Sequence, residues 1–204
     1  MIIYCKTVLF SFHKIVYNAL IRFVVWSFGK EEKMNDIILL YDDCCIYEIV
    51  ILNYFMKLTK CEMLLCSAQN RTIRAMEGYS INCDISIDEL DCSTVRSFIV
   101  PGGDIANIDH ENVLDMLKKL NDREVIIGGI CAGVDILKKA GILEGICSTH
   151  SSDYDCVSDG NVITARPNAY VDFAIEVGKA LNLFEDEADV QETIEFWKNH
   201  KRIV

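Results

Sequence analysis

The chain has 204 residues, of which 51% are hydrophobic, with two prolines and 11 glycines. This length fits one compact α/β domain whose core is large enough to need no disulfide bonds. The formal net charge of -11 argues against a nucleic-acid interface, which would need a basic face. Ten cysteines include no Cys-x-x-Cys pair, and neither they nor the four histidines have zinc-ligand spacing. We therefore expect reduced thiols, a cytoplasmic location, and no metal or cofactor.

The first 33 residues differ in composition from the rest of the chain. They carry five Lys or Arg residues against two Glu, a net charge of +3, which leaves -14 for residues 34–204. Lys14, Asn18 and Arg22 recur at four-residue spacing, so no run of about 20 uncharged residues exists to span a bilayer. The spacing predicts a helix with one narrow basic stripe.

Three interpretations of residues 1–33 stay open. The segment is an interfacial membrane helix, a signal peptide without a clear cleavage site, or an over-extension upstream of a true start at Met34. We favour the over-extension, because the apolar run at residues 37–40 is typical of the first buried strand of a domain. We therefore expect an extension outside the fold, residues 1–33, and one domain, residues 34–204. Membrane contact is expected only if the extension is genuine.

From Met34 onward, predicted strands and helices alternate. The predicted strands are 37–41, 62–68, 98–100, 125–128 and 162–165, and the predicted helices are 48–58, 112–120, 134–140, 169–181 and 187–199. Apolar and polar residues alternate only weakly over residues 71–87, which predicts a β-hairpin or an excursion of the chain at the edge of the sheet. The order predicts a flavodoxin-like three-layer α/β sandwich, in which a mostly parallel sheet is covered on both faces and the chemistry lies at the carboxyl ends of its strands.

Residues 128–133 read Gly-Gly-Ile-Cys-Ala-Gly and directly follow the apolar residues 125–127. They predict a strand that turns sharply into a helix with Cys131 at the apex, which is a nucleophile elbow of the form Gly-x-Cys-x-Gly. Small residues allow the strained turn, and a helix N-terminus would lower the thiol pKa and favour the thiolate. We expect a reactive thiol; the alternative is a small buried cysteine in a turn.

A glycine turn follows another predicted strand and would reach the same edge of the sheet. Gly102 and Gly103 stand after Pro101, where they form either a plain tight turn or part of a binding site. In the second case, the backbone N–H groups of Gly103 and Ala132 would make an oxyanion hole of two preorganised donors.

Two titratable residues are further candidates at this edge. Glu48 follows the first strand, and it is either part of the site or only a carboxylate favoured by a helix dipole. His150 is the one histidine in a plausible loop near the elbow, although a lone surface histidine usually takes no part in chemistry.

Three motifs together resemble the ThiJ/PfpI superfamily, most closely its DJ-one-like branch, from residue 34 to about residue 183. They are Phe98-Ile99-Val100-Pro101-Gly102-Gly103, Gly129-Ile130-Cys131-Ala132-Gly133, and Ile163-Thr164-Ala165-Arg166-Pro167 followed by Phe173-Ala174. The resemblance implies that a protonated Glu48 hydrogen-bonds Cys131, giving a reactive, oxidation-prone thiolate, and it places a family histidine at His150. Burial beside a thiolate would also raise a carboxyl pKa. A homodimer is implied as well.

Departures from the family pattern narrow the range of activities that the resemblance implies. Ala132 stands where protease-like members have histidine and isonitrile hydratases often have threonine, which argues against both activities. Neither His150 nor His200 is followed by glutamate at the spacing that class I glutamine amidotransferases need. Cys44 and Cys45 precede Glu48 where relatives often have glycine and acidic residues, so a second thiol would lie near the site.

The resemblance implies small-carbonyl chemistry of the glyoxalase or deglycase kind. The Cys131 thiolate would add to an aldehyde such as methylglyoxal, while the N–H groups of Gly103 and Ala132 hold the oxyanion. Glu48 and His150 would move protons. One alternative is a non-enzymatic oxidative-stress sensor or chaperone in which Cys131 becomes a sulfinic acid. Another is a cofactorless hydrolase of an unknown ester or amide.

Overall fold

The computed structural model describes residues 34–59 and 62–202, and Met34–Val204 forms one compact unit. The expected extension, residues 1–33, lies outside the described residues. None of the helices in the described ranges combines the length and the hydropathy that crossing a bilayer requires.

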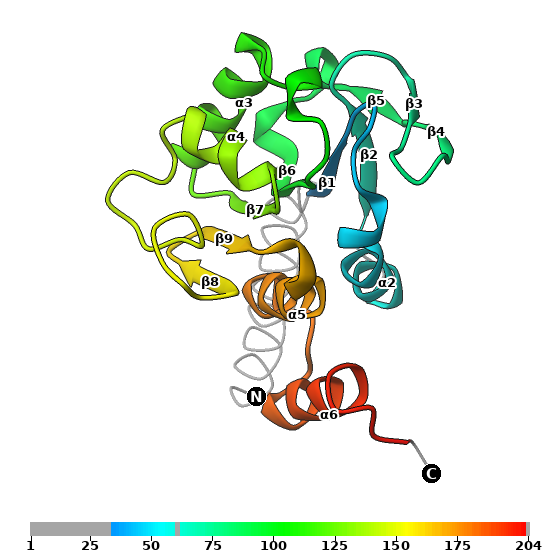
Figure 1. Ribbon diagram of the computed structural model, residues 1–204, viewed down its shortest axis with the longest axis vertical. Helices are drawn as coiled ribbons and strands as arrows, with labels where there is room; N and C mark the ends of the chain where they lie inside the picture. The colour runs from blue at the N-terminus through cyan, green and yellow to red at the C-terminus, as the bar shows by residue number, and fades with distance from the viewer. Residues whose placement is uncertain (1–33, 60–61, 203–204) are drawn as a thin grey trace, which may run out of the picture. The chain divides into compact units, whose positions relative to one another are not determined.

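A seven-stranded sheet forms the centre of this unit (Figure 1). Its strands, in chain order, are β1 (Asn35–Leu40), β2 (Met63–Ser67), β5 (Ile85–Ser86), β6 (Val95–Val100), β7 (Ile126–Ile130), β8 (Cys156–Asp159) and β9 (Val162–Ala165). Their order in space is β5-β2-β1-β6-β7-β9-β8. Neighbours are parallel, except that β8 and β9 pair antiparallel at one edge.

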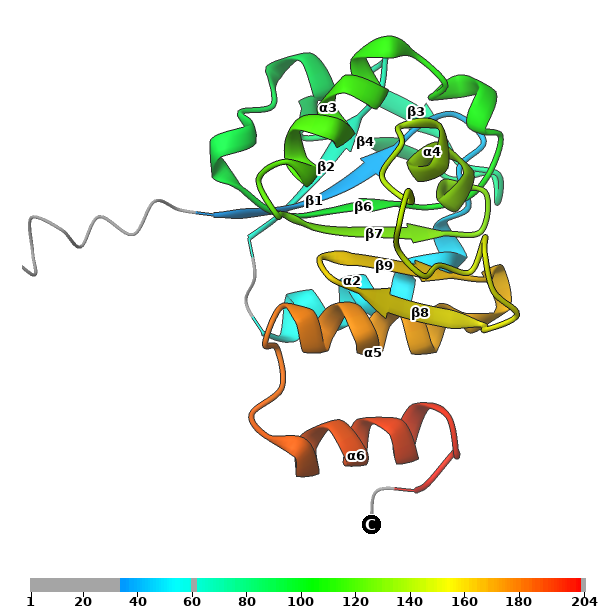
Figure 2. The same ribbon diagram turned by 90° about the vertical axis from the view of Figure 1, so that its left-hand side faces the viewer.

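Helices cover both faces of the sheet. They are α2 (Val50–Leu58), α3 (Glu111–Asn121), α4 (Gly133–Lys139), α5 (Tyr170–Ala180) and α6 (Glu187–Trp197). Figure 2 shows α3 and α4 over one face and α2 and α5 over the other, with α6 packed outside α5. The predicted three-layer α/β sandwich is therefore confirmed.

The central strands are buried from both sides, which explains their composition. Residues 37–40 of β1 and residues 98–100 of β6 have at most 1% of their surface exposed. A parallel strand between two helix layers needs such an uninterrupted apolar run. Gly128 of β7 lets α5 approach closely, because a Cβ at this position would lie 2.8 Å from the ring of Phe173.

Residues 71–87 form the predicted hairpin, the antiparallel pair β3 (Thr72–Arg74) and β4 (Ser80–Asn82), apart from the main sheet, and then the edge strand β5 of that sheet. Two elements differ from the sequence prediction. Strand β8 escapes sequence prediction because it is short and partly polar. Glu48 does not open the predicted α-helix: it ends the single 3-10 turn η1 (Ile46–Glu48), and α2 begins at Val50.

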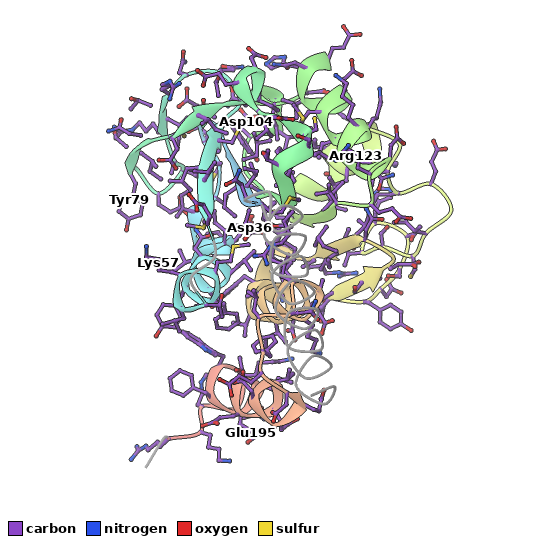
Figure 3. The ribbon with its side chains drawn as sticks, turned by 180° about the vertical axis from the view of Figure 1, so that it is seen from behind. Asp36, Lys57, Tyr79, Asp104, Arg123 and Glu195 are labelled. Atoms are coloured by element: carbon purple, nitrogen blue, oxygen red, sulfur yellow. The ribbon has the colours of Figure 1, made fainter. Side chains whose placement is uncertain are left out.

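A buried acid ties β1 to β6 at the edge of the sheet opposite the carboxyl ends of the strands. The side chain of Asp36, labelled in Figure 3, is fully buried. Its Oδ1 accepts hydrogen bonds from Nε of Arg96 at 3.0 Å and from Oγ of Ser97 at 2.7 Å. Because Ser97 is also the register partner of Asp36, these bonds fix the pairing of the two strands.

Candidate active site

The predicted elbow is present between β7 and α4. Cys131 has a φ of 56°, in the left-handed region that non-glycine residues rarely adopt. Its N–H donates to the carbonyl oxygen of Ala165 at 2.9 Å, which fixes the turn against β9. Glycine is required at position 133, because a Cβ there would lie 2.2 Å from the carbonyl oxygen of Val100. Close packing on both sides of Cys131 thus keeps its backbone in this strained conformation.

Glu48 reaches the thiol from the end of η1. It is 1% exposed, and its Oε2 accepts a hydrogen bond from the N–H of Gly102 at 2.7 Å. Its other carboxyl oxygen, Oε1, is buried and has no hydrogen-bond partner among the described residues. An unpartnered buried oxygen is costly for an ionised carboxylate, so the site favours a proton on this acid.

Gly102 lies between the acid and the thiol. A Cβ at this position would lie 2.6 Å from Cβ and 2.9 Å from Sγ of Cys131, and 2.9 Å from Oε2 of Glu48. Since any side chain would push the two groups apart, glycine is what lets them be neighbours. The Gly102 amide is engaged by Glu48, which leaves Gly103 and Ala132 as the two expected donors for a substrate oxygen.

The electrostatics of the thiol contradict the expected lowering of its pKa. Burial and the neighbouring Glu48 carboxylate raise the pKa of Cys131 to about 12, against a smaller lowering by the N–H of Ala132. Burial also raises the pKa of Glu48. The dipole of the short helix α4 is outweighed by desolvation. Because both pKa values are raised, the Cys131–Glu48 pair holds at least one proton at neutral pH, and the thiolate forms when that proton resides on Glu48.

Gly103 is fixed by the segment that follows β1. Its φ is 131°, and a Cβ there would lie 2.2 Å from the carbonyl oxygen of Asp43. Two hydrogen bonds flank it, from Cys45 N–H to Gly102 O at 2.8 Å and from Asp104 N–H to Asp43 O at 3.1 Å. The N–H of Gly103 itself has no partner within the described part of the chain.

His150 meets Cys131 from the solvent side. Both residues line an open pocket of about 360 Å³, together with Ala132, Asp135 and Arg166. Nδ1 of His150 lies 3.8 Å from Oδ1 of Asp135, and the His150 side chain is 40% exposed. Glu48 does not line this pocket, so the acid and the histidine approach the thiol from different sides.

Sequence reasoning did not assign a role to several residues around the site. Asp135 is a first-turn acid of α4 and Arg166 belongs to a quoted motif, but neither has a spacing that marks it as functional. Tyr41 is buried and donates from its hydroxyl to the carbonyl oxygen of Pro101 at 2.8 Å. Tyr47, beside Glu48, is 46% exposed. A tyrosine near the end of a strand gives no sequence signal by itself.

The expectation of a second thiol near the site concerns Cys44 and Cys45. Both are buried, and Cys44 forms the bridge to Gly103. Sγ of Cys45 lies 3.7 Å from Sδ of Met76. Burial, with the nearby Glu48, raises the pKa of Cys45 to about 11, and Cys45 contributes in turn to the raised pKa of Cys131. Cys45 is therefore a neutral thiol within electrostatic reach of Cys131.

The site lies where a parallel α/β sheet concentrates its chemistry, at the carboxyl ends of β1, β6 and β7. Fold and elbow together define an α/β protein that has a cysteine where a Gly-x-Ser-x-Gly elbow has its serine. Residues 37–180 match the model of the DJ-1/PfpI family, and the chain belongs to that family.

Several curated proteins that are similar to this chain carry enzyme names. A protein named as a deglycase from Thermococcus kodakarensis is 28% identical over 121 residues, which are 52% of this chain and 73% of the relative. YoaZ of Bacillus subtilis, named as an uncharacterized protease, is 29% identical over 131 residues, 55% of this chain and 62% of the relative. The crystal structure of a DJ-1 superfamily protein from Agrobacterium tumefaciens covers 82% of this chain and 100% of its own, with a TM-score of 0.73 and 26% identity.

Proposed function

We propose that this protein is a cysteine-dependent enzyme for small carbonyl compounds, of the glyoxalase or deglycase kind, that works without a cofactor. The observation that carries the proposal is the pairing of Cys131, at a strained elbow, with Glu48, a buried acid whose pKa is also raised. The pocket on the solvent side of the thiol adds His150 as a second proton-transfer group. Relatives named as deglycases support the same reaction class.

In this mechanism the proton of the pair first resides on Glu48, which leaves Cys131 as the thiolate. The sulfur forms a bond to the aldehyde carbon of methylglyoxal, and the carbonyl electron pair moves to the oxygen, which the N–H groups of Gly103 and Ala132 stabilise. His150 takes the proton from the former aldehyde carbon and returns it to the neighbouring ketone carbon, while the proton of Glu48 goes to the ketone oxygen, so the adduct becomes a thioester of lactate. Water then cleaves the resulting thioester, so methylglyoxal and water give lactate and the free thiol.

The test compares lactate formation by the purified protein and by Cys131→Ser, without glutathione. We expect turnover by the wild-type protein and a loss of at least a factor on the order of 10³ in the variant, because the hydroxyl is a far weaker nucleophile at its ordinary pKa. Cys147→Ser, which changes an exposed cysteine, is the matched control and should retain full activity. Equal rates for wild type and Cys131→Ser would exclude this mechanism.

A second candidate function is supported by the unpartnered Oε1 of Glu48. If a hydroperoxide oxidises Cys131 to the sulfinic acid, a protonated Glu48 can donate to one of the new oxygens and the N–H of Ala132 to another. The protein would then act as an oxidative-stress sensor. Intact-mass measurement after mild peroxide treatment tests it: two added oxygen atoms on Cys131 support the sensor, and oxidation first at exposed Cys147 opposes it.

Cellular location is part of the same proposal. The eight cysteines within the described residues are all free thiols. Free thiols at this density are typical of a reducing compartment, so we propose a cytoplasmic location.

A further inference from the structure

Among the described residues, Arg166 is the one lysine or arginine that lines the pocket at Cys131. It directly follows β9, and the carbonyl oxygen of Ala165, the last residue of that strand, accepts the N–H of Cys131 at 2.9 Å. The backbone of Arg166 is held on both sides, because its N–H donates to Asp155 O at 2.8 Å and its carbonyl oxygen accepts the N–H of Ala169 at 2.9 Å. Arg166 is therefore fixed beside the elbow as part of the pocket wall.

The guanidinium group of Arg166 makes no hydrogen bond within the described part of the chain. Its Nη2 lies 3.8 Å from Oδ1 of Asp153 and its Nε lies 3.7 Å from Oδ1 of Asp155, and both distances exceed that of a hydrogen bond. Arg71, in contrast, donates from Nη2 to both carboxyl oxygens of Glu89 at 2.7 Å. The planar donor fork of Arg166 is thus left for a ligand.

The other charges around the pocket do not occupy this fork. Asp135 and His150 are the further charged or titratable side chains that line the pocket beside the thiol. Oδ1 of Asp135 lies 3.8 Å from Nδ1 of His150, so the acid is paired with the histidine. Asp153 and Asp155 stand outside the pocket lining, and their side chains are exposed. Arg166 is therefore the group in this wall that attracts an anion.

We propose that Arg166 is a specificity-determining residue that selects small carbonyl compounds carrying a carboxylate group. The inference rests on the proposed function of Cys131 and names the substrate class of that site. A guanidinium fork matches the two oxygens of a carboxylate and binds them through parallel N–H donors. The carboxylate would be held in this way while the thiolate of Cys131 adds to the aldehyde carbon.

Glyoxylate is the smallest compound of this kind and serves as a probe. It has a carboxylate where methylglyoxal has an acetyl group, so the two compounds have nearly the same size and differ in charge. The sulfur of Cys131 forms a bond to the aldehyde carbon, the carbonyl electron pair moves to the oxygen, and this oxygen takes the proton of the Cys131–Glu48 pair. Glyoxylate has no ketone carbon to receive a further proton, so the reaction stops at the hemithioacetal and glyoxylate acts as an inhibitor.

The first test does not need turnover. It compares two alkylating reagents of the same shape, iodoacetate, which carries a carboxylate, and iodoacetamide, which is neutral. Each forms a bond from the Cys131 sulfur to its CH2 carbon and releases iodide. In Arg166→Gln the ratio of the iodoacetate rate to the iodoacetamide rate should fall about fivefold at low salt, because the carboxylate loses its charged donor. Added salt should shrink this difference from wild type, and Arg166→Lys, which keeps the charge without the fork, should retain part of the ratio.

Arg123→Gln is the matched control. Arg123, labelled in Figure 3, is an exposed arginine that precedes β7, whereas Cys131 follows that strand. Its removal changes the net charge equally and should leave the ratio at Cys131 as in wild type. The ratio at exposed Cys147 should be the same in every variant. An unchanged ratio at Cys131 in Arg166→Gln, or an equal fall in Arg123→Gln, would overturn the proposal.

Turnover gives a second readout. Glyoxylate should inhibit methylglyoxal turnover competitively, and in Arg166→Gln the ratio of its inhibition constant to the KM for methylglyoxal should rise about fivefold. An equal change in both constants would show that Arg166 does not distinguish a carboxylate from an acetyl group. If wild type has no turnover of methylglyoxal, the proposed function fails, and the alkylation ratio alone decides whether Arg166 selects carboxylates.

Discussion

A single carboxyl group sets the chemistry of the Cys131 thiol. Glu48→Gln keeps a hydrogen-bonding side chain but removes the charge and the transferable proton. Turnover should therefore fall by a factor on the order of 10². Since the carboxylate is one of the groups that raise the thiol pKa, the midpoint of Cys131 alkylation should move to lower pH in the variant. An alkylation profile that matches wild type would mean that the two groups are not coupled.

Glu48 should destabilise the folded protein at neutral pH. Burial raises the folded-state pKa of Glu48 above its ordinary value of 4.5. The protonated form is favoured by the fold, so this stabilising contribution is full below pH 4.5 and is lost as pH rises through the folded-state pKa. Glu48→Gln cannot ionise, so its melting temperature should exceed that of wild type at pH 8 and approach it at pH 4. The reverse trend with pH would contradict the raised pKa.

The space at Gly102 is a second property of single residues. Its φ is not left-handed, so alanine there is penalised by contact with Cys131 and Glu48 alone. We expect Gly102→Ala to lower the free energy of unfolding by about 1–3 kcal/mol and to change the pH profile of Cys131 alkylation. Gly145→Ala is the control, because that glycine has a φ of 79° and open space around it. It should lose stability through backbone strain yet keep the wild-type alkylation profile.

At the level of elements, the bond network of Asp36 should matter for the sheet and not for the site. Asp36→Asn replaces a buried carboxylate that faces Arg96 and Ser97. We expect the free energy of unfolding, measured in urea, to fall by about 1–3 kcal/mol. The expected loss is smaller than for a fully buried ion pair, because Arg96 is partly exposed. Asp115→Asn, at an exposed pair with Lys118, should change stability by less than about 0.5 kcal/mol. Cys131 alkylation should be normal in both variants.

The elements that carry the site can be predicted from the sequence, whereas the pKa values inside the site cannot. The glycines beside Cys131 and the apolar run before it have local causes, a strained turn and a buried strand, and these can be seen in a short stretch of sequence. The pKa of the thiol cannot be predicted from a short stretch, because it depends on burial and on Glu48, which is distant in sequence. The 3-10 turn that carries Glu48 and the four residues of β8 are too short for a periodic pattern.

At the scale of the whole molecule, an exposed apolar surface supports the expected homodimer. Among residues 34–59 and 62–202, nine large hydrophobic side chains are exposed. Six of them lie on η1, α2 and the turn between β3 and β4: Tyr47, Val50, Tyr54, Leu58, Met76 and Tyr79. Figure 3 labels Tyr79 and, on α2, Lys57. Apolar side chains gathered in this way are typical of an interaction surface.

Sedimentation velocity tests the dimer. We expect the wild-type protein to sediment as a dimer and Leu58→Asp to sediment as a monomer, with Tyr154→Asp, at an exposed tyrosine outside this surface, as the control. Each copy carries a formal charge of -11, so added salt should strengthen association by screening the repulsion. A wild-type protein that is monomeric at all salt concentrations would contradict the homodimer.

The position of Gly102 between Sγ and the Glu48 carboxyl also has a consequence for folding. The three groups follow three different central strands, β1, β6 and β7, so they come together only when those strands pair in register. The influence of Glu48 on Cys131 is thus a built-in reporter of sheet assembly. In a refolding experiment with pulsed alkylation, the alkylation rates of Cys131 in wild type and in Glu48→Gln should differ only once the central sheet has formed. In any earlier collapsed state, Cys131 should react at the rate of an ordinary thiol in both proteins.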